Sequence, residues 1–259
     1  MNLDLSNKRA LVCGGSLGIG KAVAKELSTL GCQVTLLSRN EDHLSSAVKD
    51  LEGSGHSYLM ADHANSDDLK RIISDHIAKD NSYHILINNS GGPSAGPALD
   101  ATEDQFIRAI RMHVVGNQII SQALIPAMKK ENYGRIINII STSVKQPIPG
   151  LMVSNTTRAA VANWAKTLSQ EVGAYGITVN NVLPGSTDTV RIHELAEDRA
   201  SRSGNSKDDE LKKIISAGSI KRLAEPWEIG AAVAFLASPS ASYITGINLP
   251  VDGGKTQSL

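Results

Sequence analysis

The sequence predicts a single α/β domain built on an open, doubly wound parallel sheet, and three observations support this prediction. Strand-like segments alternate strictly with helix-like segments along the chain. Several strand-like segments are apolar on both faces, as at residues 136–140, which indicates a sheet covered by helices on both sides. The connections are long enough for the crossovers that parallel strands need. Because no linker or repeat divides the chain, we expect residues 1–259 to form one domain.

The first strand, turn and helix form a candidate phosphate site. Residues 9–13 are strand-like and apolar, a glycine-rich turn runs from Gly14 to Gly20, and residues 21–30 have apolar side chains at helical spacing. In this layout the unpaired N–H groups and the positive dipole end of a helix face the turn, where an anion is favoured. The turn therefore predicts nucleotide binding, although such turns also serve as plain strand-to-helix connections.

The remaining elements follow in order. We predict further strands at residues 33–38, 57–61, 83–88, 134–140, 176–183 and 247–251. We predict further helices at residues 41–51, 67–79, 102–130, 153–172 and 225–237. The tetrapeptide Thr102-Glu103-Asp104-Gln105 has the pattern of a capping box. Ligands of this architecture bind beyond the carboxyl ends of the strands, so the residues that follow each strand are the candidate site.

Residues 189–220 interrupt the alternation. They are polar, charged and helix-prone, with a break at Ser203-Gly204-Asn205. One interpretation is a solvated excursion on the surface. The other is a substrate lid, because the segment leaves the sixth strand directly at its carboxyl end.

Composition narrows the classes of partner. The 26 basic and 26 acidic residues balance, so we expect no nucleic-acid or membrane partner. We expect no signal peptide, because the first residues show no basic region followed by an apolar core, and no apolar run approaches about 20 residues. We expect Cys13 and Cys32 to be buried thiols rather than a disulfide or metal site. These observations predict a cytoplasmic protein with a small-molecule substrate and no metal.

Four motifs together resemble those of the short-chain dehydrogenase/reductase superfamily. They are Gly14-x-x-x-Gly18-Ile19-Gly20, Asn88-Asn89-Ser90-Gly91, the stretch 179–185 and the stretch 246–254. The resemblance covers nearly the whole chain. It implies an NAD(P)(H)-binding fold and, usually, a homotetramer.

The resemblance also implies which residues contact the cofactor. The glycine turn would lie under the phosphates, Asp62 beside the adenine, Asn89 and Gly91 along the adenine ribose side, and residues 184–189 at the nicotinamide. The expected set is Gly14, Ser16, Leu17, Gly18, Ile19, Ser38, Arg39, Asp62, Asn89, Gly91, Arg158, Pro184, Gly185, Thr187 and Thr189.

The end of the second strand distinguishes the two nicotinamide cofactors. An acidic residue there binds both ribose hydroxyls and repels a 2′-phosphate, whereas an arginine attracts the phosphate. This chain has Ser38 followed by Arg39, and a guanidinium binds phosphate through charge-assisted contacts. We therefore favour NADP(H) over NAD(H), with a solvated surface arginine as the alternative for Arg39. Leu17 stands where many NADP-using relatives carry a second basic residue, which weighs against this choice.

The expected catalytic residues depart from the superfamily pattern of Asn, Ser and Tyr-x-x-x-Lys. Ser141 matches the serine, but Ser154 and Arg158 stand at the tyrosine and lysine positions, and His113 stands at the asparagine position. The segments 91–93, 145–149 and 154–158 resemble a divergent branch, labelled 3-oxoacyl-carrier-protein-reductase-like, that lacks the Tyr and Lys pair.

These departures change the chemistry that the site can perform. Arg158 can bind ribose hydroxyls but cannot release a proton, and the Ser154 hydroxyl is a far poorer acid than a phenol. Losing a general acid typically costs about 10²–10⁴ in rate. His113 could replace the acid if it faces the cavity, although a packed or solvated histidine is the commoner case. Alternatively, an activated C=C or quinone substrate would need no protein acid.

Two functions follow from the sequence. The first is an NADP(H)-dependent oxidoreductase of the short-chain type, with retooled or degraded catalytic residues, acting on a small or acyl-linked carbonyl, such as a 3-oxoacyl thioester, or on an activated alkene. The second is a catalytically silent NADP(H)-binding protein, a sensor or an assembly subunit.

Overall fold

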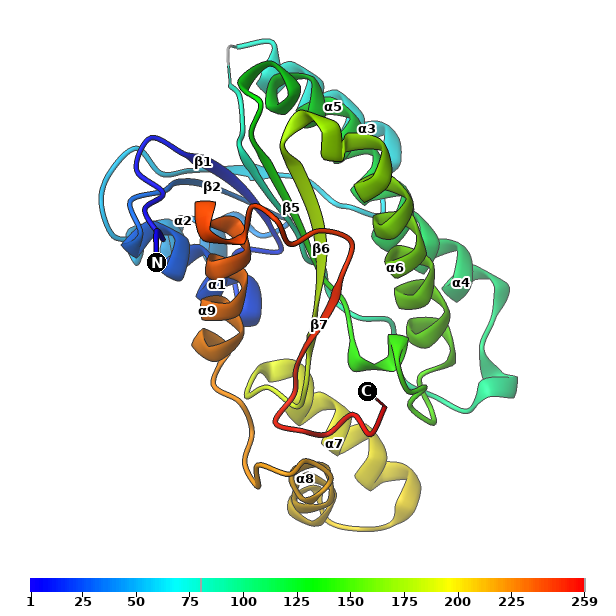
Figure 1. Ribbon diagram of the computed structural model, residues 1–259. Coiled ribbons are helices and arrows are strands. Elements are labelled where there is room, and N and C mark those ends of the chain that lie inside the picture. Colours follow the sequence, from blue (N-terminus) through cyan, green and yellow to red (C-terminus); the bar gives the residue numbers. More distant parts are fainter. Residues whose placement is uncertain (80, 259) are drawn as a thin grey trace.

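Seven parallel strands form one sheet in the order β3-β2-β1-β4-β5-β6-β7 in the computed structural model, which describes residues 1–79 and 81–258 (Figure 1). The strands are β1 Arg9–Cys13, β2 Gln33–Ser38, β3 Ser57–Met60, β4 Ile85–Asn88, β5 Gly134–Ile139, β6 Ile177–Pro184 and β7 Asn248–Val251. The order reverses between β1 and β4, where the crevice of a doubly wound sheet lies. The predicted fold class is confirmed.

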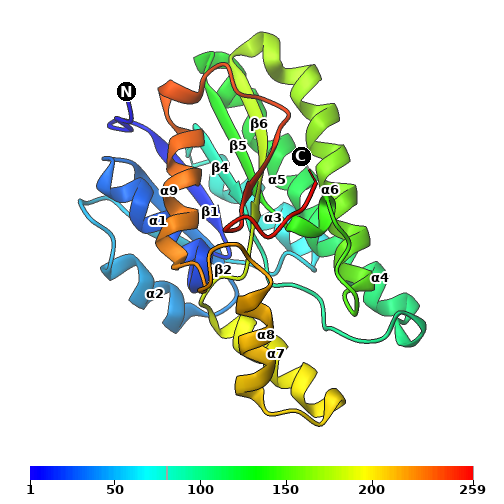
Figure 2. The ribbon, with the colours of Figure 1, turned by 60° about the horizontal axis from the view of Figure 1, so that its bottom comes forward.

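Helices cover both faces of this sheet (Figures 1 and 2). One face carries α1 Gly18–Thr29, α2 Glu41–Lys49 and α9 Pro226–Ala237, and the other carries α3 Ser66–Ile77, α5 Gly116–Glu131 and α6 Met152–Val172. Adjacent residues of β5 enter opposite cores: Ile136 packs with the α3 and α5 side, and Ile137 packs with the α1 and α9 side. Both faces of β5 are apolar because each face packs into a hydrophobic core.

The first helix begins inside the glycine turn, at Gly18 rather than at Lys21 as predicted. Gly20 allows this early start, because a Cβ there would lie 2.1 Å from the Gly14 carbonyl oxygen. The glycine turn therefore packs directly against the first turn of the helix, because Gly20 has no side chain where it approaches the Gly14 backbone.

The predicted long helix at residues 102–130 is confirmed, but it contains a π-helical turn that was not predicted. It comprises α4 Glu103–Ile110, a π-helical turn at Arg111–Val115, and α5. The predicted capping box is confirmed, since Thr102 and Gln105 each accept a hydrogen bond from the other's backbone N–H. The π-helical turn contains the buried His113, and π-helical turns are often found at functional sites.

A row of asparagines crosses the sheet and was not predicted. Asn88 donates to Asn138 at 2.9 Å, Asn138 donates to Asn181 at 2.8 Å, and Asn181 donates to Asn248 at 2.8 Å. Each pair occupies directly matched positions of neighbouring strands from β4 to β7. The row therefore depends on the register of the sheet.

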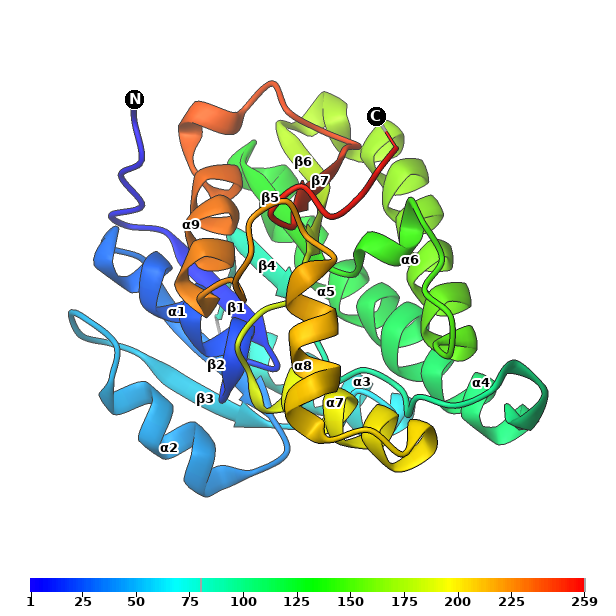
Figure 3. The ribbon, with the colours of Figure 1, turned by 90° about the horizontal axis from the view of Figure 1, so that it is seen from below.

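Residues 189–220 form two helices, α7 Val190–Ser203 and α8 Lys207–Ser216, which lie across the carboxyl ends of the strands (Figure 3). The predicted break is confirmed at Gly204, which has a φ of +73°. Cys13 and Cys32 are buried free thiols, as predicted. None of the helices described is both long and apolar enough to span a membrane.

Candidate functional site

The glycine turn is joined to the end of β4 at the carboxyl edge of the sheet. Gly14 has a φ of +57° and donates its N–H to the Leu37 carbonyl at 2.7 Å. Asn89 Nδ2 donates to the Gly14 carbonyl at 3.2 Å. The first and second motifs, which we predict to bind the phosphates and the adenine ribose, therefore meet, as the parallel arrangement of the strand ends requires.

The adenosine end of the candidate site has groups that fit a phosphate. The Ser38 hydroxyl oxygen is buried and has no hydrogen-bond partner among the described residues. Next to it, the Arg39 side chain is 68 % exposed and its Nη1 lies 4.0 Å from Asp62 Oδ2. An unpaired hydroxyl beside an accessible guanidinium matches the donors that a ribose 2′-phosphate would need. The residues present therefore fit NADP(H).

The opposite end of the site is closed by the segment after β6. Gly185 donates to the Val251 carbonyl at 2.9 Å, and Asp188 donates to the Ala224 carbonyl at 2.8 Å. A Cβ on Gly18 would lie only 3.3 Å from Thr189 Cγ2. Gly18, which the sequence assigned to the phosphates, and Thr189, which it assigned to the nicotinamide end, are thus neighbours.

Arg158 is a buried cation anchored at the sheet edge. It lies one helical turn after the half-buried Ser154 on α6, and only 7 % of it is exposed. Its Nη1 donates to the Ile139 carbonyl at 3.0 Å, and its Nη2 donates to the Ser90 carbonyl at 3.4 Å. Burial, followed by the nearby Arg191, lowers the pKa of Arg158 to about 10. The guanidinium therefore remains charged at neutral pH.

Ser141 lies two residues beyond Ile139, at the start of the turn after β5. Its half-buried hydroxyl oxygen accepts a hydrogen bond from the Ser143 N–H at 3.1 Å. A hydroxyl that accepts this bond keeps its own proton to donate. The structure therefore brings a hydrogen-bond donor and the Arg158 cation to the same strand end.

His113 is enclosed and neutral. It is 1 % exposed, its Nδ1 lies 2.8 Å from the Ser90 hydroxyl oxygen, and its Nε2 is buried without a partner among the described residues. Burial lowers the pKa of His113 to about 2, with smaller contributions from Arg158 and His63. An imidazole with this pKa cannot act as an acid at neutral pH. It can hold Ser90, which the sequence showed only as part of a motif.

No tyrosine of the chain lies at the carboxyl end of β5, where Ser141 and Arg158 meet. Tyr83, Tyr133, Tyr175 and Tyr243 precede β4 to β7 at the opposite, amino-terminal edge of the sheet. The fifth, Tyr58, lies on the outer strand β3, separated from β5 by three strands, and donates to Glu41 at 3.0 Å. All five tyrosines of the chain are in the described residues, so none can serve the carboxyl end of β5.

The α7 helix is fastened to the loop after β4. Arg191 Nη2 donates to the Pro93 carbonyl at 2.6 Å, and Arg202 Nη1 donates to the Ala95 carbonyl at 3.4 Å. Arg191 was not among the predicted site residues, because no motif marks it. A cavity of about 320 Å³ opens beside this contact. It is lined by residues 94–97, 100, 101 and 105, by Arg202, and by Met152 and Val153 just before Ser154.

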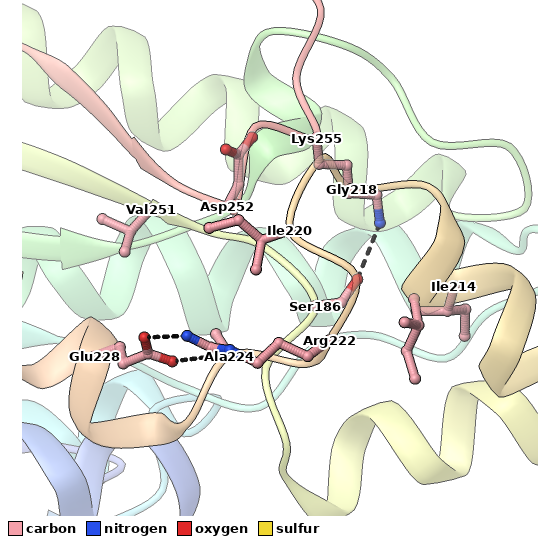
Figure 4. Close-up of a pocket in the computed structure, with 12 residues that line it drawn as sticks. Ser186, Ile214, Gly218, Ile220, Arg222, Ala224, Glu228, Val251, Asp252 and Lys255 are labelled. Atoms are coloured by element: carbon pink, nitrogen blue, oxygen red, sulfur yellow. Dashed lines mark hydrogen bonds and ion pairs between the residues drawn. The ribbon is translucent and has the colours of Figure 1, made fainter.

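A smaller cavity of about 160 Å³ lies behind the nicotinamide end (Figure 4). Lys255 Nζ donates to the Ser186 hydroxyl at 3.1 Å, and Arg222 donates two bonds to Glu228 at 2.6 and 2.7 Å. The C-terminal segment thus supports the loop that contains Gly185. This cavity does not include any of the predicted catalytic residues.

Comparison with known proteins gives the family. Residues 14–256 match the family model described as enoyl-(acyl carrier protein) reductase. The chain is 32 % identical to the 3-oxoacyl-[acyl-carrier-protein] reductase FabG of Rickettsia prowazekii, over 97 % of this chain and 98 % of that protein. It is 30 % identical to human dehydrogenase/reductase SDR family member 4, over 98 % and 90 % respectively.

Solved structures agree with these matches. The L-sorbose reductase of Gluconobacter frateurii, complexed with NADPH and L-sorbose, is similar with a TM-score of 0.93 and 28 % identity over the whole of both chains. YwfH, an NADPH-dependent reductase involved in bacilysin biosynthesis, is similar with a TM-score of 0.90 and 28 % identity over 97 % of this chain and 99 % of YwfH. The protein described here belongs to the short-chain dehydrogenase/reductase family.

Proposed function

We propose that this chain is an NADP(H)-dependent oxidoreductase that acts on a carbonyl or an activated alkene, including substrates like 3-oxoacyl thioesters. The observation that carries the proposal is the meeting of the glycine turn, the Ser38 and Arg39 pair and Thr189 along one sheet edge. Similarity to reductases that are NADPH-bound or NADPH-dependent supports the choice of cofactor.

The cofactor would lie along this edge from Arg39 to Thr187. Arg39 and Ser38 would hold the 2′-phosphate, Asp62 the adenine, and the helix N-terminus after Gly14 the pyrophosphate. The remaining predicted contacts, Ser16, Leu17, Ile19, Asn89, Gly91 and Pro184, would line the passage between these points. Bound NADPH supplies a hydride to the substrate.

The predicted catalytic residues would have separate roles in binding the substrate and the cofactor. Ser141 would donate its free proton to a hydrogen bond with the substrate oxygen, and Ser154 would face the same substrate. Arg158 has five N–H donors, of which two are used by backbone carbonyls, so others remain for the cofactor ribose. We assign His113 as a positioning residue that holds Ser90, because the neutral imidazole lacks the proton that a general acid must give.

A silent NADP(H)-binding protein remains the second candidate. It is favoured by one observation: no group described near Ser141 combines an acidic proton with a pKa near neutrality. In that case the nucleotide would control binding or assembly rather than donate a hydride.

NADPH oxidation separates these two functions. We would measure the Kd of NADPH by its fluorescence, then follow NADPH absorbance with a panel of ketones, quinones, enones and 3-oxoacyl thioesters. Oxidation coupled to one substrate class supports the oxidoreductase. Tight NADPH binding with no oxidation across the panel would favour the silent protein.

The segment 189–220 would act as the lid over this site. The bonds from Arg191 and Arg202 to the loop after β4 support a closed position. The homotetramer and the cytoplasmic location stay predictions.

A further inference from the structure

We propose that the substrate is an alkene conjugated to a carbonyl, and that Arg158 holds the enolate oxygen that forms when hydride adds to the C=C bond. This inference rests on the proposed oxidoreductase function and narrows it from two substrate classes to one. It also gives Arg158 a second role besides binding the ribose.

The charge of Arg158 is not compensated by the chain. None of the ion pairs among the described residues includes Arg158, although it is 7 % exposed. Its two backbone acceptors, Ile139 and Ser90, satisfy hydrogen bonds but carry no negative charge. A buried cation without a counter-charge is costly to retain, and an anion that forms during the reaction would gain from it. Arg191 on the lid adds positive charge nearby.

The lack of a protein group that can give a proton favours a conjugated alkene over a ketone as substrate. Hydride addition to a ketone carbon leaves an alkoxide, which is strongly basic and needs a proton as it forms. Hydride addition to the β-carbon of an enone or enoyl thioester leaves an enolate, whose charge is delocalised and less basic. A fixed cation and a hydroxyl suffice to stabilise an enolate. Arg158 and Ser141 provide these two groups, whereas His113 and the five tyrosines provide no acid.

The electrons and protons balance without a protein acid. The hydride leaves NADPH, which becomes NADP⁺, and forms a C–H bond at the β-carbon. The π electrons of the C=C bond move to make the C=C–O⁻ enolate, with the oxygen beside Arg158 and Ser141. A proton from water then adds to the α-carbon, the carbonyl re-forms, and hydroxide is neutralised by solvent. The rest of such a substrate would lie in the cavity of about 320 Å³, which is lined by Val153 but not by Ser141, Ser154 or Arg158.

A matched pair of thioesters tests the substrate class. The N-acetylcysteamine thioesters of trans-2-butenoate and 3-oxobutanoate share one skeleton and differ in the reducible group. In D2O with NADPH, we expect the butenoyl thioester to give a saturated product with deuterium at the α-carbon, and the 3-oxobutanoyl thioester to react at least about 100-fold more slowly. Reduction of the 3-oxo group instead would overturn this inference and leave the oxidoreductase standing. No NADPH oxidation with either compound, despite NADPH binding, would overturn both.

A second measurement tests Arg158 without turnover. 4-Nitrophenol resembles an enolate when ionised, and its absorbance reports the ionised form. At saturating NADP⁺, we expect the wild type to bind it as the anion and to lower its pKa. Arg158→Met should abolish that shift, while Arg158→Lys, which keeps the charge, should retain part of it. An equal shift in the wild type and in Arg158→Met, with both proteins folded and binding NADP⁺, contradicts the assigned role.

Discussion

Nδ1 of His113 lies 2.8 Å from the hydroxyl oxygen of Ser90, and the carbonyl oxygen of the same Ser90 accepts a hydrogen bond from Arg158 at 3.4 Å. Ser90, two residues after β4, thus joins His113 and Arg158, two of the predicted catalytic residues. A change at either position would move Ser90, so His113 and Arg158 should be treated as one unit rather than as two independent substitutions.

The buried histidines should make the protein sensitive to acid. Burial lowers the pKa of His113 to about 2 and that of His63 to about 4, whereas both protonate near 6.5 when the chain unfolds. The unfolded state therefore binds more protons between pH 6.5 and 4, and stability falls as the pH decreases through that range. Each histidine contributes about 1.4 kcal/mol per pH unit at most.

Urea unfolding at pH 7, 6 and 5 measures this slope. We expect the unfolding free energy of His113→Asn and of His63→Asn to fall less steeply with decreasing pH than that of the wild type. The difference in slope should correspond to at most one proton for each variant. His43→Asn is the control, because His43 is exposed on α2 and should leave the slope unchanged. A slope in His113→Asn equal to that of the wild type would show that His113 is charged in the folded protein.

Arg39 should determine the preference for NADPH. Arg39→Ala removes a charge-assisted contact to the 2′-phosphate, which is worth about 1.5–3 kcal/mol and less when exposed to salt. We expect the Kd of NADPH to rise about tenfold at low salt and the Kd of NADH to change little. Arg71→Ala, an equally exposed arginine on α3, serves as the control. An unchanged ratio of the two Kd values would leave Arg39 as a surface residue.

The asparagine row should stabilise the carboxyl half of the sheet. Asn138 is 0 % exposed, and Asn138→Leu would leave the Asn88 amide and the Asn181 oxygen buried without partners. Each unpaired group costs about 1–3 kcal/mol, so we expect a loss of about 2–6 kcal/mol in unfolding free energy. Asn163→Leu on the exposed face of α6 is the matched control. Equal stability of the two variants would contradict this assignment.

The fold, and the meeting of the predicted cofactor contacts at one edge of the sheet, could be predicted because they depend on local patterns. The apolar segments such as residues 136–140 define the strands, and parallel topology then brings Gly14, Arg39, Asn89 and Thr189 to one edge. The asparagine row could not be predicted, since Asn138 and Asn181 become partners only through the pairing register of β5 and β6. The π-helical turn likewise depends on the packing of His113 and Gly116, which helical periodicity does not encode.

The candidate catalytic residues could be located but not interpreted from sequence. Spacing identifies Ser154 and Arg158 as neighbours on one helix face, and the structure agrees. The protonation of His113 depends on its burial and on Ser90, which only the three-dimensional arrangement reveals. The contact of Arg191 with Pro93 joins residues 98 positions apart. It could not be predicted, because neither residue belongs to a motif that indicates it.

The contact between Arg191 and Pro93 should hold the lid closed. Arg191→Ala removes a bond from a charged donor, which is worth about 1.5–3 kcal/mol, so the open population should rise about tenfold or more. Limited proteolysis within residues 203–206, with and without NADPH, measures that population. Lys212→Ala on the exposed side of α8 is the control. Equal cleavage rates in both variants would show that this bond does not restrain the lid.

Restoring the superfamily pair should convert the chemistry. In Ser154→Tyr with Arg158→Lys, a phenol beside an ammonium group can give a proton to a forming alkoxide, because the lysine lowers the pKa of the tyrosine. We expect reduction of the 3-oxobutanoyl thioester to rise about 10²–10⁴-fold, the usual contribution of a general acid. Reduction of the butenoyl thioester should fall, because the buried guanidinium is gone. Ser154→Phe with Arg158→Lys is the control, since it has the ring without the hydroxyl. If both double variants fold and bind NADPH but reduce neither thioester, then Ser154 does not face the substrate, and the alignment of α6 with the superfamily helix would have to be revised.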